Sequence, residues 1–107
     1  MTTHPANGLD DIVHQRVRLG ILTIAHEARQ VEFSYLRDTL GLTAGNLSQH
    51  LGVLENAGLI TLDKGYAGKR ARTWIMLTKA GHAALAEEIA SLKLLINTVE
   101  HAATPPE

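Results

Sequence analysis

Two short runs with helical spacing, each opened by a hydroxyl residue and closed by a glycine, constrain this chain most. Ser34 and Gly41 bound the first run, and Thr43 and Gly58 bound the second. Serine and threonine are favoured N-caps, and a glycine after a periodic run supplies the left-handed residue that ends a helix. The pattern predicts two short helices separated by a tight turn. Their predicted ranges are 35–40 and 44–57.

The second of these helices has one apolar face and one polar face. Leu47, Leu51 and Leu54 recur at a spacing of four and three residues, which places them on one side of a helix. Its other sides carry Asn46, Ser48, Gln49, His50 and Val53. Two helices across so short a turn are typical of a helix-turn-helix. Because Asn and Gln pair with adenine through two hydrogen bonds, we predict that Asn46, Gln49 and His50 read DNA bases.

After Gly58 the apolar pattern changes from helical to extended. Residues 59–62 and 72–77 are rich in β-forming side chains and predict two strands, with residues 63–71 as a flexible loop between them. The chain has a net charge of -1, but residues 59–79 hold five Lys and Arg against one Asp. This local excess of positive charge predicts contacts with DNA phosphates. The predicted backbone contacts are Ser34, Tyr35, Ser48, Lys64, Lys69, Arg70 and Arg72.

A long helix follows Thr78, which is a further N-cap candidate, and residues 79–103 form a predicted dimerisation helix. Its apolar residues repeat at spacings of four and three, as in a coiled-coil seam. These residues are Leu85, Ile89, Leu92, Ile96 and Val99. A helix this long at the end of a small domain has little of its own chain to cover it, so we predict a homodimer.

The chain before the helix-turn-helix predicts one further helix, over residues 10–29. Its main apolar face is Val13, Val17, Ile21, Ile24 and Ala28. A second stripe, Ile12, Leu19 and Leu22, is predicted to join the dimer interface. Residues 1–9 are predicted to be a flexible arm, residues 10–78 the DNA-binding unit and residues 104–107 a disordered tail.

Composition excludes several classes of protein. At 107 residues and 45% apolar residues, the chain fits one globular domain. It has no cysteine, which excludes disulfides and thiolate metal sites, and no secretion signal or membrane span, so we expect a cytoplasmic protein. No catalytic arrangement or cofactor motif is present, and we expect neither an enzyme nor a bound metal. A metal site shared between subunits through His82 or His101 stays open.

A family resemblance supports this interpretation. Residues 42–60, LTAGNLSQHLGVLENAGLI, and residues 64–78, KGYAGKRARTWIMLT, resemble the recognition helix and wing of bacterial MarR- and ArsR-type transcription regulators, of the short single-domain kind. The resemblance implies a winged helix-turn-helix, an α+β fold that is mainly helical with a small β-hairpin. It further implies that Thr43, Ala44, Asn46, Gln49 and His50 face the DNA groove. Lys69, Arg70 and Arg72 would serve the wing.

The sequence therefore predicts a homodimer that binds double-stranded DNA at a pseudo-palindromic operator and regulates transcription, as a repressor. The alternative is a winged-helix module that binds another protein and no DNA. MarR-like relatives often bind small aromatic ligands, so an unknown effector is a further possible partner. The four aromatic residues Phe33, Tyr35, Tyr66 and Trp74 do not by themselves indicate a pocket.

Overall fold

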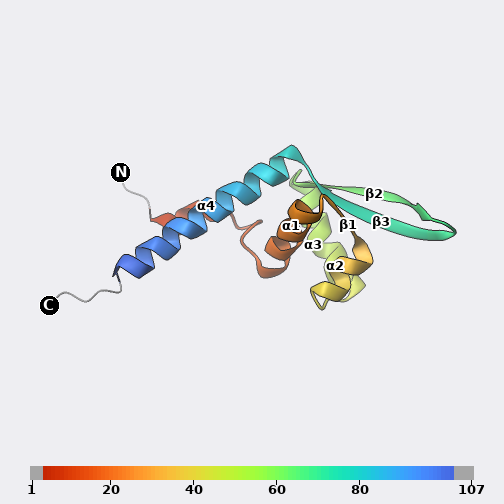
Figure 1. Cartoon of the computed structure of the whole chain (residues 1–107), viewed down its shortest axis with the longest axis horizontal. Helices are drawn as coiled ribbons and strands as arrows, with labels where there is room; N and C mark the ends of the chain where they lie inside the picture. The colour runs from red at the N-terminus through yellow and green to blue at the C-terminus, as the bar shows by residue number, and fades with distance from the viewer. Residues whose placement is uncertain (1–3, 103–107) are drawn as a thin grey trace.

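The computed structural model describes residues 4–102 and shows four α-helices and a three-stranded sheet (Figure 1). The elements in chain order are a 3₁₀ helix η1 (Pro5–Gly8), α1 (Arg16–Ala28), β1 (Gln30–Glu32), α2 (Phe33–Thr39), α3 (Ala44–Asn56), β2 (Ile60–Ala67), β3 (Arg70–Leu77) and α4 (Lys79–Ala102). Helix α4 and the β2–β3 hairpin project from opposite sides of the helical body, so the molecule measures 68 × 27 × 22 Å. Within this range no helix is long and apolar enough to cross a membrane.

The sheet is antiparallel with the strand order β1-β3-β2. Strand β1 was absent from the sequence prediction, because three residues are too few to show an alternating pattern. It forms because Val31 lies opposite Ile75 of β3, and both side chains are buried in the core. The hairpin strands are also longer than predicted, since Lys64 pairs with Thr73 and Ala67 pairs with Arg70. The predicted nine-residue loop is reduced to a turn at Gly68, which has φ 65°.

One apolar core joins α1, α3 and the sheet. Its buried residues are Val13, Val17, Ile21, Leu22, Ala25, Val31, Leu36, Leu47, Leu51, Leu54, Ile60, Ile75 and Leu85. This arrangement corrects two predicted dimer contacts, since Leu22 is fully buried and Leu85 is 5% exposed within one chain. Leu19 is partly buried against the same core. Leu19 and Leu22 of the second stripe therefore pack inside the domain, while Ile12, which precedes α1, is 36% exposed.

The helix-turn-helix forms as the capping pattern predicted, with one correction. Thr43 caps α3 by accepting a hydrogen bond from the Asn46 amide at 3.1 Å, and Gly41 and Gly58 adopt φ values of 66° and 77°. Ser34 is not the N-cap of α2, because β1 runs directly into the helix and Glu32 takes that position. The Ser34 hydroxyl instead donates to the Glu32 carboxylate at 2.6 Å.

The N-terminal region differs from the predicted helix and arm. Helix α1 begins at Arg16 because the Gln15 side chain caps it, accepting from the Arg18 amide at 2.8 Å. Before it, the Asp10 carboxylate accepts hydrogen bonds from the amides of Ile12 and Val13 and folds this segment into a turn. Residues 5–8 form η1, which lies against α4 in place of a loose arm. The predicted tail at residues 104–107 lies outside the described residues.

Among the contacts that hold helix α4 to the domain, two lie near its start and its middle. The Thr78 hydroxyl accepts from the Gly81 amide at 3.0 Å, as the predicted cap requires, and Gly81 packs so closely that a Cβ there would lie 2.0 Å from the Leu59 carbonyl oxygen. Further along, the buried Glu88 carboxylate lies 2.6 Å from His14 Nδ1. These contacts fix the direction in which the second half of α4 leaves the domain.

Candidate nucleic-acid interface

Helix α3 presents a polar surface opposite its buried leucines. Thr43, Ala44, Asn46, Ser48 and Gln49 are exposed, while Leu47, Leu51 and Leu54 are at most 2% exposed. The leucine face fixes the rotation of the helix about its axis. Asn46 and Gln49 therefore lie together on a surface that is free to enter a groove.

His50 lies on the same helix, but it contacts a residue that the sequence prediction missed. Arg18 Nη1 lies 3.1 Å from His50 Nδ1. Arginine has only donors, so Nδ1 must accept, and the neutral ring then carries its proton on Nε2. Burial lowers the pKa of His50, and the charges of Arg18 and Arg16 lower it further. His50 is thus held as a neutral hydrogen-bond donor.

Arg18 also connects α3 to the segment before α1. Its Nε donates to the Ile12 carbonyl at 2.6 Å, and its Nη2 donates to the Asp11 carbonyl at 3.3 Å. The side chain brings a positive charge to a helix that has no Lys or Arg of its own. No pattern in the sequence indicated this role, because Arg18 and His50 are 32 positions apart.

The pleat of the hairpin separates its basic residues. Residues directly opposite one another in an antiparallel pair share a face of the sheet, and successive residues alternate. Lys64, opposite Thr73, is on the face that includes the core residue Ile75. Arg70 and Arg72 are on the other face, and Lys69 lies in the turn at the tip.

Arg72, a predicted backbone contact of the wing, already has an acidic partner within the chain. It forms an ion pair with Glu32, and the two side chains are 30% and 22% exposed. Glu32 also accepts from Ser34, and these two hydrogen bonds lower the pKa of its carboxyl. Arg72 therefore ties the wing to β1.

Two small cavities bring the remaining predicted backbone contacts together. Ser34 and Arg70 line a polar cavity of about 250 Å³ between α2 and β3, together with Arg37, which is paired with Asp38. Ser48 and Lys64 line a second cavity of about 380 Å³ between α3 and the hairpin. Tyr35, which is 56% exposed, belongs to neither of these cavities.

The histidines are engaged within the chain. His82 Nδ1 lies 2.9 Å from His26 Nδ1, and His101 Nδ1 lies 2.7 Å from the Asn97 carbonyl oxygen. Between residues 4 and 102, no group of three or more His, Asp or Glu side chains is arranged to hold a metal ion.

Comparison with known proteins defines the class of this chain. The family described as "winged helix DNA-binding domain" matches residues 17–96, and the chain belongs to that family. An uncharacterized protein of Methanocaldococcus jannaschii is 34% identical over 89 residues, which cover 83% of this chain and 97% of the relative.

Solved structures support the same assignment. The structure of a transcriptional regulator homologue from Pyrococcus horikoshii OT3 superposes with a TM-score of 0.77 at 36% identity, over 82% of this chain and 87% of that one. A MarR-family regulator from Rhodococcus sp. RHA1 gives a TM-score of 0.67 at 18% identity, over 97% and 71% of the two chains. This second likeness concerns the fold alone.

Proposed function

We propose that this protein is a transcriptional regulator that binds double-stranded DNA as a homodimer. The observation that carries the proposal is the rigid mounting of α3, whose buried leucines leave Asn46 and Gln49 exposed beside a hydrogen-bonded His50. The family match and the regulator homologue from P. horikoshii support the same function.

Base reading is assigned to the exposed polar face of α3. Asn46 and Gln49 each offer a donor and an acceptor to adenine, and the Nε2 proton of His50 suits the N7 or O6 acceptors of a purine. Thr43 and Ala44, at the exposed start of the helix, would contact the groove edge. Because the Arg18 contact already fixes the His50 ring, base recognition by His50 would lose little side-chain entropy on binding.

Backbone binding is assigned to the hairpin and to its neighbours. Lys69 and Arg70 near the tip are exposed and would supply two positive charges to phosphate. Lys64 and Ser48 would act nearer to α3, and Ser34 beside Arg70 would add a neutral hydrogen bond. Tyr35, which is 56% exposed near the start of α2, would add a further neutral hydrogen bond.

Dimerisation is assigned to the second half of α4. Ile89, Ile96 and Val99 are 37%, 54% and 61% exposed, although they repeat at the spacing of a helix seam, and Leu92 is half-buried between them. Burying such a stripe against a second copy would place two α3 helices on one duplex. Two half-sites about one helical turn apart would follow. Occupancy of such an operator blocks other proteins from the DNA, which favours repression.

The proposal is tested by selecting duplexes from a random library with the purified protein and then titrating salt on the enriched duplex. We expect an inverted repeat whose affinity falls steeply with salt, because phosphate contacts release counterions. Gln49→Ala should cost about 1–3 kcal/mol on the selected site and relax the base preference at one position of each half-site. Asn97→Ala, on the exposed surface of α4, is the matched control. A library that stays unenriched at low salt would overturn the proposal.

A further inference from the structure

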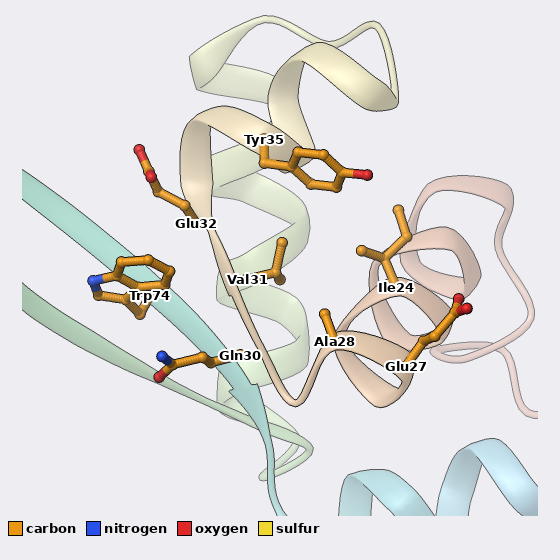
Figure 2. A pocket seen from close by; sticks show the side chains of 8 residues that line it. All are labelled: Ile24, Glu27, Ala28, Gln30, Val31, Glu32, Tyr35 and Trp74. Carbon is orange, nitrogen blue, oxygen red and sulfur yellow. The ribbon is translucent and has the colours of Figure 1, made fainter.

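A hollow lies at β1, the edge strand of the sheet (Figure 2). Its volume is about 490 Å³, within the usual range for a small-molecule site. It is lined by Ile24, Glu27, Ala28, Gln30, Val31, Glu32, Tyr35 and Trp74. Two aromatic residues that are 39 positions apart in the sequence, Tyr35 and Trp74, therefore share one pocket.

The lining has an apolar centre and an acidic rim. Figure 2 shows Ile24, Ala28 and Val31 between α1 and β1, while Tyr35 and Trp74 flank β1 on its two sides. Two of the lining residues, Glu27 and Glu32, carry carboxylates, and no Lys or Arg is among the lining residues. Aromatic faces and carboxylates both attract cations.

The two carboxylates are not equivalent. Glu32 is neutralised by Arg72 and also accepts from Ser34. Glu27, the penultimate residue of α1, makes no ion pair or side-chain hydrogen bond with any residue between 4 and 102. Its negative charge is thus uncompensated at the rim of an apolar pocket.

A strained residue lies at the same place. Arg29 joins α1 to β1 with φ 70° and ψ -52°, and it is the one non-glycine residue with positive φ among those described. Such a conformation is costly for a residue with a side chain and persists when the surrounding structure fixes it, often at ligand sites. Its neighbours on both sides, Ala28 and Gln30, line the pocket.

We propose that this pocket binds an organic cation with an apolar body, such as a hydrophobic ammonium or amidinium compound. The apolar body would lie on Ile24 and Val31 between the two aromatic rings, with the charge directed to Glu27. Tyr35 belongs to the first helix of the helix-turn-helix and Trp74 to the wing strand. A ligand there would contact both parts that the proposed function places on DNA, and would change DNA affinity.

Binding can be measured without DNA, because Trp74 is the only tryptophan of the chain. Its fluorescence is titrated with three probes on one skeleton: phenylbutylammonium, phenylbutanol and phenylbutanoate. We expect the ammonium probe to bind at least about tenfold more tightly than the carboxylate, with the alcohol between them. Equal binding, or tighter binding of the carboxylate, would overturn the assignment of charge.

Variants test which residues are responsible. Glu27→Gln should remove the preference for the ammonium probe and leave the affinity for phenylbutanol unchanged. Glu87→Gln, at an exposed glutamate of α4, is the control with the same change in charge and should bind as the parent does. If Glu27→Gln keeps the full preference for the ammonium probe, the site is not this pocket.

The regulatory part rests on the proposed function and is tested separately. The affinity for the selected duplex is measured with and without saturating phenylbutylammonium, in the parent and in Glu27→Gln. We expect a change in DNA affinity in the parent alone. If no duplex is selected, the proposed function fails while the fluorescence titration still decides the pocket. If DNA binds and the probe does not, the pocket proposal fails and the proposed function stands.

Discussion

Arg72 and Arg70 point from the same face of the wing, yet only Arg72 has an ion-pair partner among residues 4–102. Arg72 pairs with Glu32 at the end of β1, while Arg70 is exposed near the hairpin tip. The Nε atom of Arg72 is buried and makes no hydrogen bond with the described residues. The pair therefore couples the wing to β1 and α2, whereas Arg70 keeps its charge for a partner outside the chain.

This difference predicts opposite effects for two similar substitutions. Arg70→Ala should leave the melting temperature unchanged, weaken binding to all duplexes and reduce the salt slope by about one phosphate contact. Arg72→Ala should lower the melting temperature, because it leaves Glu32 partly buried without its ion-pair partner. Thermal unfolding and salt titrations on both variants check this. An unchanged salt slope in Arg70→Ala would contradict its assignment to the DNA backbone.

Substitution by alanine at two helical glycines, Gly81 and Gly52, should change the folding stability in opposite directions. Gly81 touches the Leu59 carbonyl, so Gly81→Ala must displace α4 from β2, which should cost about 1–3 kcal/mol. Gly52 lies inside α3, where an added Cβ would meet no side chain and no other element within 4 Å, and Gly52→Ala should stabilise by about 0.5–1 kcal/mol through helix propensity. Urea unfolding measures both. A stabilised Gly81→Ala would show that the α4 junction is looser than described.

His50 gives a pH dependence with a definite sign. Burial and the nearby arginines lower its pKa in the folded state below the ordinary value of 6.5. Well above pH 6.5, His50 is neutral in both the folded and the unfolded chain, and its contribution to the free energy of unfolding is fully present. As pH falls through 6.5, His50 becomes protonated in the unfolded chain but stays neutral in the folded chain. The free energy of unfolding therefore declines until the pH reaches the lower pKa of the folded state.

The measurement for His50 is an NMR titration of the histidine ring protons. We expect one resonance, assigned by its loss in His50→Gln, to titrate with a pKa below the ordinary histidine value of 6.5. Arg18→Gln should raise this pKa only part of the way, because burial is the larger cause. A His50 resonance that titrates at or above 6.5 would contradict the contact with Arg18.

The sequence predicted the elements whose signals are local. Thr43, Gly41 and Gly58 cap or end helices through interactions within a few residues, and their effects are visible in the chain. The polar face of α3 followed from the spacing of its leucines. Strand β1 could not be predicted, because it depends on pairing with β3 about 44 residues later. The same long-range pairing brings Arg72 beside Glu32, so a charge that the sequence assigned to DNA forms an ion pair within the chain.

The pocket at β1 shows the same limit at the level of function. Tyr35 and Trp74 carry no common motif, and only the β1–β3 pairing, which sets Trp74 opposite Glu32, brings them together. Arg18 and His50 meet for a similar reason, through the packing of α1 on α3. Contacts between distant segments depend on the tertiary fold and leave no periodic signal.

The final prediction concerns α4, where burial divides the predicted seam into two functions. Leu85 is 5% exposed and belongs to the core, so Leu85→Ala should cost about 2–5 kcal/mol of folding stability. Ile96 is 54% exposed, and Ile96→Glu should leave the domain folded but place a charge in the proposed seam and prevent dimerisation. Asn97→Glu adds the same charge at the next, exposed position of α4 and should remain dimeric. Urea unfolding measures the loss in Leu85→Ala, and sedimentation velocity measures dimerisation in the two glutamate variants. A dimeric Ile96→Glu would move the interface away from this half of α4, and the spacing of the two DNA half-sites would then have to be set by another surface.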